Sequence, residues 1–149
     1  MKEVVSFRLV GTRPIAWTTP RISHRGRFKD PRLKKWQEII GKVAKSAMER
    51  AGRTMVAGPV SLAIRVYRPL EEGYNVDDPA WVAPGKSEVG KPNLTNILKA
   101  IEDGLQGAVY ENDKQVVRQE CSMRYGEDWE VRIAVFELGD EPLPDDCFD

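Results

Sequence analysis

Seven basic residues stand between positions 21 and 35, a density that attracts polyanions. They are Arg21, Arg25, Arg27, Lys29, Arg32, Lys34 and Lys35. Binding of nucleic acid to such a segment would release counterions from the phosphate backbone. Lysines and arginines also commonly solvate a helix face and the loop before it. The run by itself leaves these two interpretations about equal.

The soft metal ligands of the chain are few, and this restricts its metal chemistry. One histidine (His24) and two cysteines (Cys121 and Cys147) cannot build a zinc site of cysteine and histidine, or a disulfide scaffold. Any metal must therefore be held by oxygen. Asp103 lies near the end of a predicted helix, where its charge is unfavourable against the helix dipole, which hints at another role for this carboxylate.

Four strands and two helices are expected to position these residues. Alternating apolar residues predict strands over 4–10, 60–66, 115–125 and 129–138, and the last two are expected to form a hairpin. Asp30 and Pro31 predict the start of a helix that Gly52 closes, and helical spacing predicts a second helix over 93–105. Residues 11–29 are expected to form a long basic loop, and residues 70–92 a substrate-side loop. The order β-α-β-α-β-β predicts an α+β single domain with a mixed β-sheet.

The net charge of zero hides a strong asymmetry along the 149 residues. Residues 1–53 contain 14 Lys and Arg against 4 Asp and Glu, so the remaining residues are acidic by the same margin. The expected folded domain covers 1–138, and the tail 139–149, with five acids and two prolines, is expected to be disordered. No apolar run approaches the ~20 residues that span a bilayer, and the N-terminus lacks a signal-peptide core. A cytoplasmic protein without a membrane partner is expected.

The stretch from Lys91 to Val117, KPNLTNILKAIEDGLQGAVYENDKQVV, resembles the RusA family of Holliday junction resolvases. Three blocks at fixed spacing carry the resemblance, which extends more loosely over most of residues 1–138. The matching residues are Lys91, Pro92, Leu94, Asn96, Lys99 and Ala100, then Asp103, Leu105 and Gly107, then Tyr110, Asn112, Asp113, Gln115, Val116 and Val117. So many matches over 27 residues are far more specific than a single short motif.

The resemblance implies a structure-selective endonuclease that resolves four-way DNA junctions by paired nicks with Mg²⁺ or Mn²⁺. Family members hold the metal with acids that match Asn93, Asp113 and often Thr95, and Asp103 is a further metal candidate. Lys99 follows Thr95 by four residues, about 40° around the helix, so its ammonium can meet the scissile phosphate at the same site. The implied catalytic residues are therefore Asp113, Lys99, Asn93 and Thr95.

The chain departs from the family pattern at two of these positions. Asn93 stands where the family has Asp, and Thr95 where many members have Asp. An amide oxygen can ligate a divalent ion but brings no negative charge, and both residues are also good helix N-caps. Either Asn93 inactivates the enzyme, or Glu102, Asp103, Asp77 or Asp78 compensates.

The resemblance also implies partners. A four-way junction has approximate two-fold symmetry, so a homodimer with one active site per subunit suits two symmetric nicks. The junction would be recognised through shape and phosphates, with Arg21, Arg25, Arg27, Lys29 and Lys91 as contacts. The alternative is a non-catalytic branched-DNA binding protein with the same fold.

Overall fold

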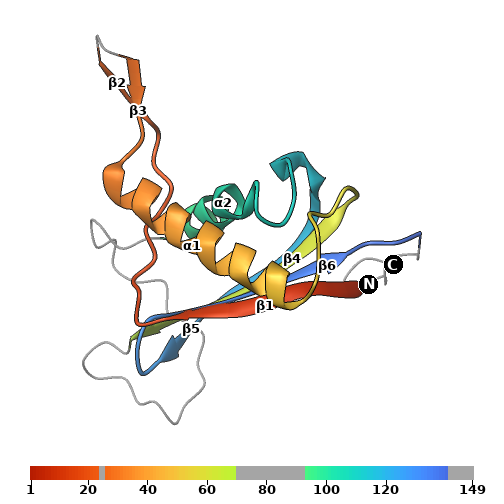
Figure 1. Cartoon of the computed structure of the whole chain (residues 1–149). Coiled ribbons are helices and arrows are strands. Elements are labelled where there is room, and N and C mark those ends of the chain that lie inside the picture. The colour runs from red at the N-terminus through yellow and green to blue at the C-terminus, as the bar shows by residue number, and fades with distance from the viewer. Residues whose placement is uncertain (24–25, 70–92, 141–149) are drawn as a thin grey trace, which may run out of the picture.

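A four-stranded sheet in the order β1-β6-β4-β5 forms the centre of the fold (Figure 1). The computed structural model describes residues 1–23, 26–69 and 93–140. The strands are β1 (Lys2–Val10), β4 (Val60–Pro69), β5 (Val116–Gly126) and β6 (Glu130–Glu137). Strands β4 and β5 run parallel, and the other two pairs are antiparallel. The predicted mixed sheet of an α+β fold is confirmed.

The alternating residues of the central strands build the core. Leu62 and Ile64 on β4 are paired in register with Val135 and Ile133 on β6, and all four are buried. Successive side chains of a strand point to opposite faces, so this register places one apolar row beside another on the same face. That face needs a cover, which the helices provide.

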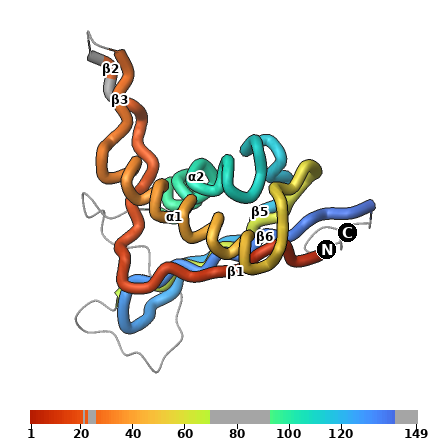
Figure 2. The backbone as a smooth tube through the Cα atoms, viewed as in Figure 1, coloured from red at the N-terminus to blue at the C-terminus, as the bar shows by residue number. Residues whose placement is uncertain are grey.

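Both helices lie on one face of the sheet (Figures 1 and 2). They are α1 (Pro31–Arg50) and α2 (Leu94–Leu105). The predicted cap of α1 is confirmed, because the Asp30 side chain accepts a hydrogen bond of 2.8 Å from the backbone N–H of Arg32. The helices cross closely where a Cβ on Gly104 would lie 3.2 Å from the Ile40 side chain. A side chain at position 104 would therefore have to displace the Ile40 side chain slightly, and glycine avoids this displacement.

The expected hairpin between 115–125 and 129–138 is wrong. The two strands exist, but β4 lies between β5 and β6 and pairs with both. The chain enters β5 from α2, so β4, α2 and β5 form a crossover unit in which the amphipathic helix covers the sheet. The short connection between β5 and β6 suggested that the two strands pair with each other. The crossover through α2, which buries the apolar face of this helix, places β5 beside β4 instead.

The expected loop over 11–29 contains a small hairpin that the sequence did not predict. Strands β2 (Arg21–Ser23) and β3 (Gly26–Phe28) pair antiparallel and stand away from the sheet and helices (Figure 1). Strands of three residues are too short to show periodicity. The hairpin is exposed, with Ile22 at 77% and Phe28 at 50% of their full exposure. In the described part of the chain, no helix is long and apolar enough to cross a membrane.

Candidate active site

The start of α2 carries Asn93 and Thr95, which stand at positions where the resemblance implies acids. The Asn93 side chain caps the helix, and its oxygen accepts a hydrogen bond of 2.9 Å from the backbone N–H of Asn96. Thr95 is exposed in the first turn. Neither residue forms a hydrogen bond with an acidic side chain of the described residues. The capping role that their residue types indicated is therefore present at Asn93.

One face of α2 carries a polar stripe that begins at Thr95. Lys99, Glu102 and Asp103 follow at spacings of four, seven and eight residues, which returns all of them to the same side of the helix. The Lys99 ammonium lies 3.7 Å from the centroid of the Trp17 ring, a cation–π contact. The segment that holds Trp17 is tied to the same helix, because its backbone N–H donates to the Asn96 carbonyl at 3.0 Å.

The far end of this stripe is acidic. Burial raises the pKa of Glu102, and the neighbouring charge of Asp113 raises it further. Burial also raises the pKa of Asp103, where Lys29 opposes the shift, Asp113 adds to it and Lys99 opposes it. Asp113 therefore lies close enough to Glu102 and to Asp103 for its negative charge to raise both pKa values, and Lys99 opposes both shifts.

Asp113 is held at this place by a hydrogen-bonded turn. It opens the short 3₁₀ helix η1 (Asp113–Gln115), for which Asn112 is the cap. The Gln115 side chain accepts from the backbone N–H of Asn112 at 3.0 Å and donates to two backbone carbonyls in the segment before β4. These bonds fix the turn against the core.

Glu102 is held from two sides. The buried Tyr110 hydroxyl donates a 2.7 Å hydrogen bond to the backbone carbonyl of Glu102. The Gln119 side chain on β5 donates to the Glu102 carboxylate. Sequence reasoning missed Gln119 and Trp17, because each approaches α2 from an element whose place depends on the tertiary fold. Gln119 follows the exposed Val117 by two residues, so the alternation of β5 places both on the same face of the strand.

The structure brings together some of the predicted site residues. Asp113, Asp103 and Lys99 influence one another electrostatically. Thr95 lies seven residues before Glu102, which is about 10 Å along the helix axis. The acidic cluster is therefore at the opposite end of the stripe from the helix start, and Lys99 lies between the two ends.

The carboxylates have the donor chemistry of a magnesium or manganese site. Their oxygens are hard ligands, and a divalent cation would relieve the repulsion by Asp113 that, after burial, raises the pKa values of Glu102 and Asp103. Among the residues that the structure describes, no group of three or more His, Cys, Asp or Glu side chains lies close enough to hold a metal ion. The carboxylates therefore fit Mg²⁺ or Mn²⁺ in their chemistry. In the described part of the chain they do not lie close enough together to form a complete metal site.

The predicted DNA contacts lie partly on the hairpin. Arg27 and Lys29 are exposed on and just after β3, and Lys29 is the residue that links this basic segment to Asp103. Arg21 lies on β2, paired in register with Phe28. The predicted contacts Arg25 and Lys91, and the loop acids Asp77 and Asp78, lie outside the described residues, as do the loop 70–92 and residues 141–149 of the tail.

Comparisons with known proteins agree with the resemblance in the sequence. The family model described as "Endodeoxyribonuclease RusA" matches residues 12–136. A protein of Bacillus subtilis (strain 168), described as "Uncharacterized protein YqaN", is 29% identical over 145 residues, which cover 91% of this chain and 98% of the relative. The family match includes the hairpin, both helices and Asp113.

Proposed function

The chain belongs to the RusA family of endodeoxyribonucleases, and from this membership we propose that it resolves four-way DNA junctions by metal-dependent paired nicking. Its proposed substrate is branched DNA, and its proposed location is the cytoplasm. The proposal covers three properties that the family name leaves open: the metal, the site residues and a homodimeric assembly.

One observation carries the proposal. Burial raises the pKa of Asp103 on α2, Lys29 at the base of the basic hairpin opposes this shift, Asp113 from the turn after α2 adds to it, and Lys99 opposes it. Acidic ligands for a cation and basic groups for phosphate thus lie side by side. Cleavage of a phosphodiester needs both kinds of charge at the scissile bond.

Different residues have different roles in the proposed reaction: metal binding, phosphate binding and proton acceptance. Asp103 and Asp113 would hold Mg²⁺ or Mn²⁺, which supplies charge for the phosphate oxygens and activation for the attacking water. Lys99 binds a non-bridging oxygen of the scissile phosphate, and Trp17 holds the lysine in place. Glu102, whose pKa is raised by burial and by Asp113, accepts a proton near neutral pH more readily than an ordinary carboxylate.

A homodimer suits the substrate. A four-way junction has approximate two-fold symmetry, and two symmetric nicks on opposite strands give two ligatable duplexes. A two-fold dimer places one acidic cluster at each of the two strands. The exposed hairpins β2–β3 would contact the arms through phosphates, which gives preference for shape over sequence.

The test is an end-labelled four-way junction incubated with the protein, with and without Mg²⁺, and separated on denaturing gels. Symmetric nicks that need the metal are expected on the junction, with little cutting of a duplex of the same sequence. Native gels of the same mixtures measure binding, and sedimentation measures the assembly. Metal-independent cutting, or no cutting with Mg²⁺ or Mn²⁺, would overturn the proposal.

The Asn93 cap supports a second candidate function. Its side-chain oxygen already accepts from Asn96 N–H, and the residue brings no charge to a metal. A protein that binds branched DNA without cutting it would keep the fold and the basic hairpin. Tight binding on native gels without nicks on denaturing gels would identify this function.

A further inference from the structure

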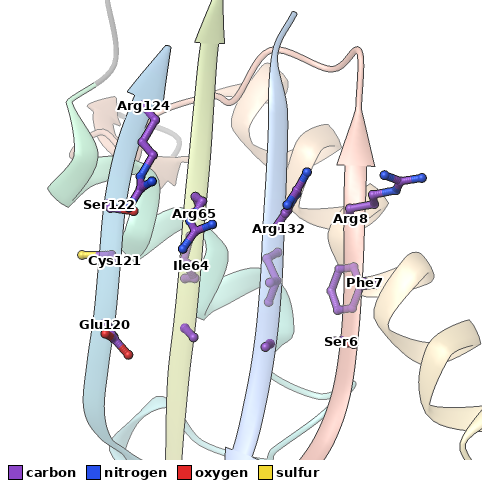
Figure 3. A pocket seen from close by; sticks show the side chains of 13 residues that line it. Ser6, Phe7, Arg8, Ile64, Arg65, Glu120, Cys121, Ser122, Arg124 and Arg132 are labelled. Atoms are coloured by element: carbon purple, nitrogen blue, oxygen red, sulfur yellow. The ribbon is translucent and has the colours of Figure 1, made fainter. Parts of the chain in front are cut away.

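The face of the sheet that the helices leave open carries a row of arginines (Figure 3). Arg8 on β1 is the register partner of Arg132 on β6, and Arg132 is in turn the partner of Arg65 on β4. Arg65 is paired with Ser122 on β5, and Arg124 follows two positions later, on the same face of the sheet. Four guanidinium groups from four strands thus border one region of the open face.

This arrangement is unfavourable for the sheet alone. Like charges directly opposite on adjacent strands destabilise the pairing, and Arg132 has an arginine on both sides. Glu130 offsets part of the charge, at 3.6 Å from Arg8 and 3.4 Å from Arg132. One carboxylate serves two guanidiniums, and Arg65 has no ion pair with any residue that the structure describes. Arg132 also lies over the Tyr67 ring, at 4.9 Å from its centroid, so contacts within the sheet compensate the row in part and leave Arg65 without an ion pair among the described residues.

Beside the row, the face is hollow. The next line of register partners is Ser6, Ala134, Ala63 and Glu120. Three of these side chains are small, so they leave a concave region of about 740 Å³, and the arginines stand at its border (Figure 3). Glu120 supplies the acidic group at the β5 end of this line. The hollow is open to solvent and gives a large ligand access to the guanidiniums.

We propose that this open face is a second DNA-binding surface, on which Arg8, Arg65, Arg132 and Arg124 hold the phosphate backbone of a junction arm. A guanidinium is always charged and donates two parallel hydrogen bonds to phosphate oxygens. Four strands about 4.8 Å apart give a row of about 14 Å. A DNA strand advances about 3.4 Å per phosphate, so the row can follow several consecutive phosphates.

A second copy of this chain fits the face less well than DNA. A two-fold contact through the open face would place the arginine row of one copy near that of the other. The four guanidinium groups of one copy would repel those of the other. Glu130 and Glu120 are the acidic groups beside them. A polyanion satisfies the whole row at once.

The surface lies on the opposite face of the sheet from α2 and its acidic cluster (Figures 1 and 3). An arm bound there is therefore a different arm from the one whose strand meets Asp113. The inference deepens the proposed function and rests on it for the identity of the polyanion. It predicts that the protein touches two arms of one junction, which a simple duplex cannot supply.

The test compares salt dependence in two variants with the same loss of charge. The first combines Arg8→Gln, Arg65→Gln and Arg132→Gln. The control combines Lys42→Gln, Lys45→Gln and Arg50→Gln, which change exposed residues of α1. Binding of a labelled four-way junction is measured by fluorescence anisotropy at several salt concentrations. A plot of the logarithm of the association constant against log salt has a negative slope. The magnitude of this slope is expected to decrease by about 2.7 in the first variant, and its affinity to be lower on the order of 100-fold near 0.1 M salt. The control slope is expected to change by less than about 1.

The outcomes separate this inference from the proposed function. Equal slopes in the two variants overturn the inference, even where the wild type nicks junctions. Binding without nicking by the wild type, with a reduced slope in the arginine variant, overturns the endonuclease and supports the surface. A wild type that does not bind junctions overturns both. A changed sedimentation coefficient with an unchanged slope would make the face an interface between copies and overturn the inference.

A single substitution tests the inference in a variant that is expected to keep its fold, in case the triple variant does not fold. Arg65→Gln changes one exposed residue that is outside the ion pairs of the described chain. Its slope is expected to fall by about 0.9, with a cooperative thermal transition like that of the wild type. An unchanged slope in this folded variant also overturns the inference.

Discussion

The ammonium group of Lys99 lies 3.7 Å from the centroid of the Trp17 ring, although the two residues come from distant parts of the sequence. The Trp17 segment is hydrogen-bonded to α2 through the Asn96 carbonyl, so ring and ammonium are fixed on the same helix. The contact limits the rotamers of a long and otherwise flexible side chain. In the proposed reaction, this holds the charge where the scissile phosphate arrives.

Replacement of Trp17 by leucine is expected to slow nicking by about tenfold, because a loosely held lysine is seldom in the productive position. Leucine keeps most of the apolar contact of Trp17 with the core, so the melting temperature should change little. Single-turnover rates on a saturating junction measure the effect. Trp17→Phe, which keeps an aromatic face, is the control and should retain most of the rate. Equal rates in both variants would contradict the positioning role.

Asn93→Asp is expected to increase Mg²⁺-dependent nicking sharply. Aspartate caps helices as well as asparagine does, and its negative charge is favourable at a helix N-terminus, so the fold should be unaffected. The added carboxylate is the acid that the resemblance implies at this position, and its charge would attract a divalent cation more strongly than the amide does, in addition to the proposed ligands Asp103 and Asp113. Nicking rates over a range of Mg²⁺ concentrations provide the measurement. An unchanged rate would mean that other oxygens already complete the site.

Asn93→Ala separates the cap from the ligand. It removes the acceptor of the 2.9 Å hydrogen bond to the Asn96 N–H and is expected to cost about 1 kcal/mol of unfolding free energy. Chemical denaturation of Asn93→Ala and Asn93→Asp gives the comparison. If alanine leaves the stability unchanged, the cap contributes nothing to α2.

Asp113→Asn is expected to lower metal-dependent nicking on the order of 100-fold, because it removes a charged ligand of the proposed site. It should also remove the rise in melting temperature that Mg²⁺ produces in the wild type, since an ion that binds the native state stabilises it. Junction binding should remain, and anisotropy checks it. Asp128→Asn, at an exposed acid in the β5–β6 turn, is the matched control.

Stability should depend on pH through Glu102. Burial first, and then the charge of Asp113, raises the pKa of Glu102 above its ordinary value of 4.5, so the folded state binds this proton more tightly than the unfolded chain. The resulting stabilisation is complete below the unfolded pKa and is lost as pH rises through the folded pKa. Glu102→Gln should therefore raise the melting temperature at about pH 8 and leave it nearly unchanged at about pH 4.

The amide of Glu102→Gln keeps an oxygen that can accept from Gln119, so loss of this hydrogen bond does not obscure the result. Glu38→Gln on the exposed face of α1 removes the same charge and is the matched control for the loss of charge itself. A larger gain at low pH than at high pH would show that the sign of the Glu102 effect is reversed.

The elements were predictable where local chemistry decides them. Asp30 and Pro31 set the start of α1, and the alternation from Val60 to Val66 is enough to identify β4. The order of strands was not predictable, because the place of β4 between β5 and β6 depends on which surface α2 covers. The sequence did not predict the hairpin β2–β3, because a strand of three residues is too short to show an alternation of apolar and polar side chains.

The candidate site divides in the same way. Motif spacing identified Lys99, Asp103 and Asp113 as candidates, and in the structure, besides burial, the charge of Asp113 raises the pKa of Asp103 while that of Lys99 lowers it. Trp17 and Gln119 carry no local signal, since each reaches α2 only through tertiary packing. The arginine row was also hidden, because Arg8, Arg65 and Arg132 become neighbours only through the register of three strands.

Arg65→Thr is expected to stabilise the protein while it weakens DNA binding. The substitution removes a charge that lies opposite Arg132 without an ion pair of its own in the described chain, and threonine suits a strand better than most polar residues. The free energy of unfolding should rise by roughly 0.5 kcal/mol. Lys2→Thr is the control, because Lys2 is paired in register with the acidic Glu137 and its loss should not stabilise the sheet. Urea denaturation and junction affinity, measured on the same preparations, test both halves. A gain in stability together with a lower salt slope would show that the row is kept for its ligand at a cost to the fold, whereas lower stability with unchanged binding would show that Arg65 serves the sheet itself.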